Sequence, residues 1–97
     1  MSELRPSSGA RFQLVLESAT AHAAVYRCTI ATPDAELATT ATLSDDGSVD
    51  VAACAAPAEL VAALAMFAKL TARGAAQRRT EGRVAWPPRV QRWRASK

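Results

Sequence analysis

Apolar and polar residues alternate along the first half of the chain in a way that predicts four β-strands. The period of two is seen first in residues 11–17, where Phe12, Leu14 and Leu16 share one side. It recurs in three later segments, residues 22–30, 36–44 and 48–53. Because successive side chains of a strand point to opposite faces, each segment has one face suited to a core. Short connections with turn residues join the segments, so we expect an antiparallel meander over residues 11–53.

The turn between the last two segments follows from the rule that opposed residues of an antiparallel pair share a face. A two-residue turn would oppose inward-facing Leu43 to outward-facing Asp50. A three-residue loop over residues 45–47, with Gly47 in the left-handed conformation, opposes Leu43 to Val49 instead. We therefore predict the three-residue loop.

A helical period follows the strands and predicts one amphipathic helix over residues 57–77. Pro57 suits the first helical position, where its missing N–H has no partner to lose, and Glu59 lies where the helix dipole favours negative charge. Gly74 either ends the helix or is tolerated within it, so the C-terminal boundary stays open between residues 73 and 79. The apolar arc of this helix comprises Leu60, Val61, Ala63, Leu64, Phe67, Ala68 and Leu70, opposite Glu59, Lys69, Arg73 and Gln77.

Together these elements predict an α+β fold in a single domain of 97 residues. We expect a four-stranded antiparallel β-meander with one C-terminal amphipathic helix packed on one face. A flexible N-terminus, residues 1–10, precedes the sheet, and a basic tail that contains tryptophan and proline, residues 78–97, follows the helix. A chain of this length has room for one core, so no second domain is expected.

The predicted helix is too narrow to cover the predicted sheet. Four strands spaced about 4.8 Å apart make a layer roughly 15–20 Å wide, whereas a helix is roughly 10–12 Å across. Either the tail segment with Trp86, Val90 and Trp93 folds over the uncovered part of the inner face, or a second protomer does. In the second case Met66 and Leu70 on the helix are the candidate self-association surface.

Composition indicates a folded, soluble and cytoplasmic protein. Apolar residues make up 49% of the sequence, more than a disordered chain usually carries. Residues 1–10 lack the apolar stretch of a secretory signal, and no later segment has the uncharged length of a membrane span, so we expect no membrane partner. Cys28 and Cys54 are predicted to be free, buried thiols.

Charge is divided unevenly between the two parts of the chain. Residues 1–60 carry three arginines against eight acidic residues, a net charge of −5. Residues 61–97 carry nine basic residues against one glutamate, a net charge of +8. Such asymmetry indicates an anionic partner, or attraction between the two halves or between two copies of the protein.

The basic tail carries a candidate surface for a partner or a nucleic acid. Arginines neutralise phosphates while a tryptophan stacks on an unpaired base, which is the chemistry of sequence-tolerant single-strand binding. In the other interpretation Trp86 and Trp93 close the core, and the arginines form a solvated rim or stack on the indoles. The candidate surface comprises Arg78, Arg79, Arg83, Trp86, Arg89, Arg92, Trp93 and Arg94.

In its order of elements, four antiparallel strands and then a helix, the chain resembles the single-stranded-DNA-binding transcription coactivators that dimerise through their helices. The resemblance implies nucleic-acid contacts from basic and aromatic residues on the sheet. Here the outward sheet positions include Glu17, Glu36 and Asp50. The resemblance therefore concerns topology alone.

Residues for catalysis or metal binding do not gather in a known motif. His22, the only histidine, lacks a nearby nucleophile in the sequence, and Cys28 and Cys54 lack the paired spacing of zinc ligands. We therefore expect no catalytic residue, no metal and no cofactor. The first hypothesis is a small non-enzymatic interaction module that forms a homodimer or binds a protein partner. The alternative is a nucleic-acid-binding protein that uses the tail.

Overall fold

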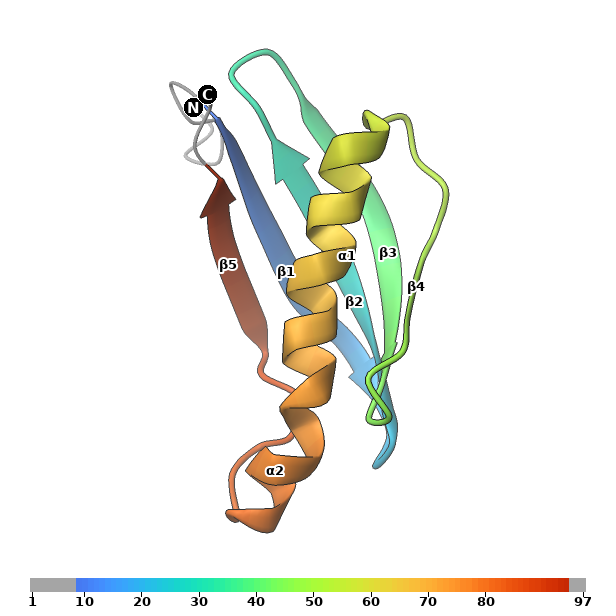
Figure 1. Ribbon diagram of the computed structural model, residues 1–97, viewed down its shortest axis with the longest axis vertical. Coiled ribbons are helices and arrows are strands. Elements are labelled where there is room, and N and C mark those ends of the chain that lie inside the picture. The colour runs from blue at the N-terminus through green and yellow to red at the C-terminus, as the bar shows by residue number, and fades with distance from the viewer. Residues whose placement is uncertain (1–8, 95–97) are drawn as a thin grey trace.

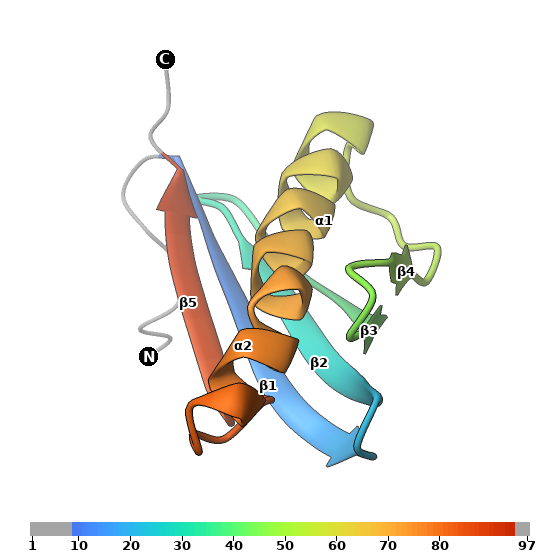
Figure 2. The same ribbon diagram turned by 60° about the horizontal axis from the view of Figure 1, so that its bottom comes forward.

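The computed structural model describes residues 9–94, which form a five-stranded sheet and two helices. Both helices lie on the same face of the sheet (Figure 1, Figure 2). Residues 1–8, most of the predicted flexible N-terminus, lie outside the described residues, and Ala10 already belongs to the first strand. The elements are β1 (Ala10–Ala19), β2 (Ala23–Ala31), β3 (Glu36–Ser44), β4 (Val49–Val51), α1 (Ala58–Arg73), α2 (Ala75–Thr80) and β5 (Arg89–Arg94).

All neighbouring strands of the sheet are antiparallel, in the order β4-β3-β2-β1-β5. The strands β1 to β4 form the predicted meander, and the α+β class is confirmed. The predicted count of four strands is wrong, because part of the tail returns to the sheet as β5 and pairs with β1 (Figure 1). Pro87 and Pro88 favour an extended chain just before this strand, and Val90 gives it a buried side chain opposite Leu14.

The hairpin between β3 and β4 has the predicted register. Leu43 lies opposite Val49, and Ala41 lies opposite Val51. Gly47 has a φ of 95°, in the left-handed region that residues with a side chain rarely adopt. The three-residue loop is therefore confirmed, and its glycine is required by the backbone conformation.

The predicted single helix is divided at Gly74. The first part, α1, ends at Arg73, and the short α2 continues to Thr80. A Cβ atom at position 74 would collide with the guanidinium of Arg78, which folds back past Gly74 and donates a hydrogen bond to the Thr71 carbonyl oxygen at 2.6 Å. The glycine thus provides the space for a contact that joins the two helices.

The core lies between the sheet and α1. Small buried residues of the helix, Ala68 and Ala72, let it approach β3 and β4 closely, while Leu64 fills the space between the layers. Phe67 of α1 packs edge-on against Phe12 of β1, with ring centroids 5.1 Å apart. More buried and more exposed residues alternate along much of β1, β2 and β3, as the predicted period of two requires.

The loop between α2 and β5 closes one end of this core. Trp86 is only 4% exposed and belongs to the buried cluster. Tyr26 of β2 donates a hydrogen bond from its hydroxyl to the Pro87 carbonyl oxygen at 2.7 Å. Burial raises the pKa of Tyr26 to about 12, so the hydroxyl keeps the proton that it donates. The loop is therefore attached to the sheet by both an apolar and a polar contact.

Candidate functional site

The face of α1 that points away from the sheet carries residues spaced three or four apart, which we call the outer stripe. This spacing places side chains on one side of a helix. Met66 and Leu70, the predicted self-association surface, are large apolar members of the stripe and are 52% and 54% exposed. Both side chains are therefore accessible to a partner. The outer stripe comprises Glu59, Ala62, Met66, Lys69, Leu70 and Arg73.

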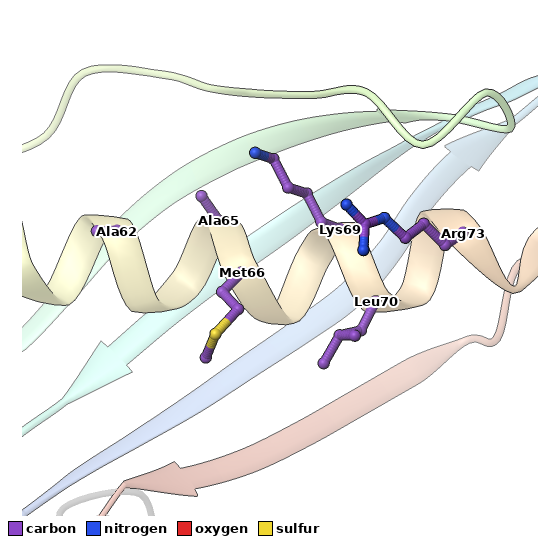
Figure 3. A pocket seen from close by; sticks show the side chains of 6 residues that line it. All are labelled: Ala62, Ala65, Met66, Lys69, Leu70 and Arg73. Carbon is purple, nitrogen blue, oxygen red and sulfur yellow. The ribbon is translucent and has the colours of Figure 1, made fainter.

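A shallow hollow lies at the middle of the outer stripe. Its volume is about 340 Å³, and the small side chains of Ala62 and Ala65 form part of its lining. Figure 3 shows Met66 and Leu70 side by side on one flank of α1, with Lys69 on the other flank. An apolar row and a basic row thus border the same hollow.

The charged members of the outer stripe have opposite signs at its two ends. Glu59 lies in the first turn of α1, whereas Lys69 and Arg73 lie towards its C-terminal end. Among the described residues, none of these three charges has a hydrogen-bond or ion-pair partner within the protein. The stripe therefore has an unpaired negative end, an apolar middle and an unpaired positive end.

The two tryptophans of the predicted tail surface lie in different environments. Trp86 is buried in the core, as the structural interpretation expects. Trp93, on β5, is 56% exposed and lies opposite Arg11, on the face of the sheet away from the helices. Only Trp93 is therefore available to a ligand.

Three of the predicted tail arginines hold parts of the protein's own chain. Arg78 donates hydrogen bonds from Nε to the Ala85 carbonyl oxygen at 2.9 Å and from Nη2 to that of Thr71. Arg79 contacts the β1–β2 turn and the β3–β4 turn, as described below, and Arg83 pairs with Glu81 at 3.2 Å. Each of the three tail arginines that precede Trp86 thus contacts another group of the protein itself.

The remaining predicted residues lie on β5. Arg89 makes no hydrogen bond or ion pair with any described residue, and Arg94 is the last residue of the strand. Arg92 donates a hydrogen bond from Nη1 to the Gln91 carbonyl oxygen at 2.8 Å. Side chains alternate along a strand, so Arg92 shares the helix-facing side with buried Val90, while Arg89 projects from the opposite face.

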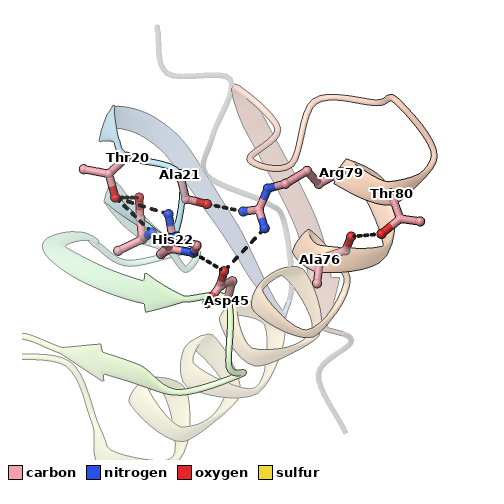
Figure 4. Close-up of polar contacts among 8 residues, drawn as sticks. Thr20, Ala21, His22, Asp45, Ala76, Arg79 and Thr80 are labelled. Atoms are coloured by element: carbon pink, nitrogen blue, oxygen red, sulfur yellow. Dashed lines mark hydrogen bonds and ion pairs between the residues drawn. The ribbon is translucent and has the colours of Figure 1, made fainter.

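A polar junction joins α2 to two turns of the sheet (Figure 4). Asp45, in the β3–β4 turn, accepts a hydrogen bond from His22 Nδ1 at 2.8 Å and lies 3.5 Å from Arg79 Nη1. Arg79 Nη2 also donates to the Ala21 carbonyl oxygen. The hydrogen bond from His22 and, to a smaller extent, the nearby Arg79 hold the pKa of Asp45 below its usual value. The junction fastens three segments that are distant in sequence.

Changing Asp45 to asparagine is expected to remove an acid-sensitive part of the stability. Because the pKa of Asp45 is lower in the folded state, its stabilisation is complete above the unfolded pKa of about 3.9 and is lost as the pH falls through the folded value. Urea unfolding from pH 7 to pH 2 should show a stability advantage of the wild type over Asp45→Asn that shrinks below about pH 5. The matched control, Asp34→Asn, changes an exposed carboxylate outside the junction. An advantage that grows on acidification below pH 5 would contradict this role for Asp45.

Both cysteines within residues 9–94 are free thiols. Cys28 is buried, and burial raises its pKa to about 11, so its reactive thiolate form is scarce at neutral pH. Cys54 is also a free thiol but only half-buried, so the prediction of two buried thiols holds for Cys28 alone. No cluster of three or more metal-ligating side chains occurs in this part of the chain. Neither described helix combines the length and the apolar character needed to cross a membrane.

Sequence reasoning found the apolar centre of the outer stripe but missed its organisation. The charges at positions 59 and 73 were assigned only to the solvated side of the helix. Glu59 lies three residues before Ala62 and Arg73 lies three residues after Leu70, and this spacing places both charges in one stripe with the apolar residues. The link between Asp45 and Arg79 joins residues 34 apart and has no local sequence signal.

Known proteins offer no further guide to the site. The sequence matches no protein-family model and no curated protein, and the structure matches no solved structure.

Proposed function

We propose that the protein is a small non-enzymatic interaction module that self-associates through the outer stripe of α1. Support comes from one observation, the combination of exposed Met66 and Leu70 with unpaired, opposite charges on the same helix face. An apolar centre with a polar rim is the usual anatomy of a protein–protein interface. A second copy of the same stripe supplies both features at once.

Two copies of α1 are complementary when they run antiparallel about a twofold axis at Met66. Residues equally far from the axis then face each other. Leu70 lies over the partner's Ala62, so a large side chain meets a small one beside the hollow. Glu59 lies beside the partner's Arg73, so opposite charges meet at both ends of the contact.

The expected dimer is weak. The 16 residues of α1 make a helix about 24 Å long. One pair of such helices buries less surface than the roughly 1,200–2,000 Å² of stable protein interfaces. We therefore expect reversible association that depends on protein concentration.

Changing Met66 to glutamate is expected to abolish self-association, because it sets two like charges against each other on the twofold axis. Sedimentation equilibrium of the wild type should approach twice the chain mass of 10.2 kDa as concentration rises, while Met66→Glu should remain at the single mass. The matched control is Val84→Glu, an equivalent change at a 70% exposed apolar residue outside the helices. A wild type that stays monomeric at high micromolar concentration would refute the proposal.

A charge exchange tests the antiparallel geometry separately. Glu59→Arg and Arg73→Glu should each weaken the dimer, because each places like charges together at both ends of the contact. The double variant should recover most of the wild-type association, since opposite charges meet again. Recovery distinguishes this pairing from a dimer that forms elsewhere on the surface.

Nucleic-acid binding by the tail, the alternative function, has weaker support. Trp86 is buried, Arg78 and Arg79 donate to backbone carbonyl oxygens of the protein, and Arg83 forms an exposed ion pair with Glu81. The candidate surface is thus reduced to residues of β5, where Arg89 and Arg92 project from opposite faces of the strand. Strong, salt-dependent binding of an oligonucleotide that is lost in Arg89→Ala would restore this alternative.

A further inference from the structure

The strand β5 lies at one edge of the sheet. Its hydrogen bonds to β1 show which of its backbone groups point away from β1. Leu16 N–H donates to the Pro88 carbonyl oxygen at 2.9 Å. In an antiparallel ladder, hydrogen-bonded pairs alternate with pairs that are not hydrogen-bonded to each other. The next residue, Arg89, lies opposite Val15, so these two residues form a pair that is not hydrogen-bonded to each other.

By the same alternation, Arg89, Gln91 and Trp93 direct their backbone N–H and C=O groups away from β1. The contact of Arg92 agrees with this assignment, because its guanidinium reaches the Gln91 carbonyl oxygen. A charged side chain over an edge group is one of the means by which natural sheets discourage unwanted pairing. Among residues 9–94, no other strand pairs with this edge, and the Arg92 guanidinium contacts one of its carbonyl oxygens.

Side chains on both sides of this edge favour a partner with acidic and apolar residues. Arg89 and exposed Trp93 flank the edge on the open face of the sheet. On the helix side, Val90 and Arg92 border a groove of about 270 Å³ that also includes Leu70 of α1. Positive charge is thus present on both faces, with an apolar groove on one of them.

We propose that an extended acidic peptide binds along β5 as a sixth strand. Its backbone exchanges hydrogen bonds with Arg89, Gln91 and Trp93, as in other strand-addition complexes. Carboxylates on alternate residues share one face of the added strand and pair with Arg89 on the open face of the sheet, while the Arg92 guanidinium leaves the Gln91 carbonyl oxygen to the peptide backbone. An apolar side chain enters the groove beside Leu70. This site goes beyond self-association, and its backbone contacts do not require the dimer.

Charge favours an acidic peptide over a second copy of β5. The strand has arginines at positions 89, 92 and 94 and no acidic residue, so pairing two copies would place like charges across the new interface. A nucleic acid has the complementary charge, but its phosphates supply only acceptors. A peptide strand supplies donors and acceptors that match the alternating groups of the edge.

Changing Gln91 to proline tests the backbone contacts directly. Proline removes the Gln91 N–H, which points away from β1, and proline is tolerated on an edge strand whose N–H faces solvent. The probe is a capped eight-residue peptide that alternates glutamate and leucine, labelled for fluorescence anisotropy. We expect Gln91→Pro to weaken binding of this peptide at least tenfold, whereas the control Gln91→Thr, which keeps the N–H, should stay within about twofold of the wild type.

Two further probes keep the test decisive if Gln91→Pro disturbs the fold. Two further peptides are tested on the wild-type protein, one N-methylated at its odd-numbered residues and one at its even-numbered residues. One of them should not bind and the other should bind nearly as well as the unmodified peptide, because only one edge of the peptide pairs with β5. Replacement of glutamate by lysine in the peptide should also abolish binding. Absence of binding by the acidic peptide, or equal binding of both N-methylated forms, would overturn the proposal. Binding of an oligonucleotide in place of the peptide would overturn it too and would identify a nucleic-acid surface instead.

Sedimentation of Gln91→Pro separates this site from the proposed dimer. Self-association through the outer stripe should be unaffected by the change, since α1 does not include position 91. Loss of the dimer in Gln91→Pro, together with failure of the peptide to bind, would show that two β5 strands pair with each other and would overturn the peptide proposal.

Discussion

Replacing Trp86 with alanine is expected to lower the free energy of unfolding by about 3–5 kcal/mol, the usual range for removing a buried aromatic side chain. Trp86 is 4% exposed and belongs to the same cluster as Tyr26 and Val90. The loop that carries it has few other means of attachment, chiefly the Tyr26–Pro87 hydrogen bond and the contact of Arg78 with Ala85. Small domains are stable by only about 5–15 kcal/mol, so this one change should remove a large part of the total.

Trp93→Ala is the matched control, since it deletes the same side chain from the surface. Trp93 is 56% exposed, and surface changes of this kind usually alter stability by no more than about 0.5 kcal/mol. Urea unfolding followed by circular dichroism compares the two variants. Fluorescence of Trp93→Phe should show the blue-shifted emission of buried Trp86, and Trp86→Phe should show the solvated emission of Trp93. Equal destabilisation by the two alanine variants would contradict the placement of the tryptophans.

The first four strands were predictable because each has its own alternation of apolar and polar residues. Phe12 and Leu14, for example, alternate with Arg11 and Gln13, and their inward faces are buried as the pattern requires. The turn at Gly47 added the register of the last pair, because only one loop length keeps Leu43 and Val49 on the same face. Local pattern and long-range pairing agree in this part of the chain.

The fifth strand was not predictable by the same means. Val90 is its only aliphatic residue, and the strand lies at the edge, where one partner and one buried side chain are sufficient. Its position beside β1 depends on a contact between residues such as Leu14 and Val90, which no local period reveals. The separate environments of Trp86 and Trp93 follow from this pairing, so the sequence alone left them open.

The candidate surfaces differ in the same way. The helical period placed Leu70 in the apolar arc opposite Lys69 and Arg73, whereas the structure leaves its side chain 54% exposed on the outer stripe beside Met66. The tail surface was proposed from composition, and the structure distributes its members among the core, internal hydrogen bonds and β5. A run of arginines alone does not indicate which guanidinium groups are used within the protein.

Replacing Arg78 with methionine is expected to lower the free energy of unfolding by about 2–3 kcal/mol. Methionine keeps much of the aliphatic volume but loses the hydrogen bonds to the Thr71 and Ala85 carbonyl oxygens. Hydrogen bonds from a charged group contribute about 1.5–3 kcal/mol each at most, and partial exposure of Arg78 reduces that figure here. The Thr71 carbonyl lies in the last turn of α1, near groups that lack a partner within the helix.

The contrast with Arg89→Met separates a structural arginine from a surface one. Arg89 has no partner among the described residues, so its loss should change stability by no more than about 0.5 kcal/mol. Gly74→Ala provides an independent check, because the added methyl group occupies the space that the Arg78 guanidinium uses. Alanine for glycine in a helix usually stabilises by up to about 1 kcal/mol, but here it should destabilise, and its effect should largely vanish in the Arg78→Met background. Additive effects of the two changes would show that Gly74 and Arg78 do not act through this contact.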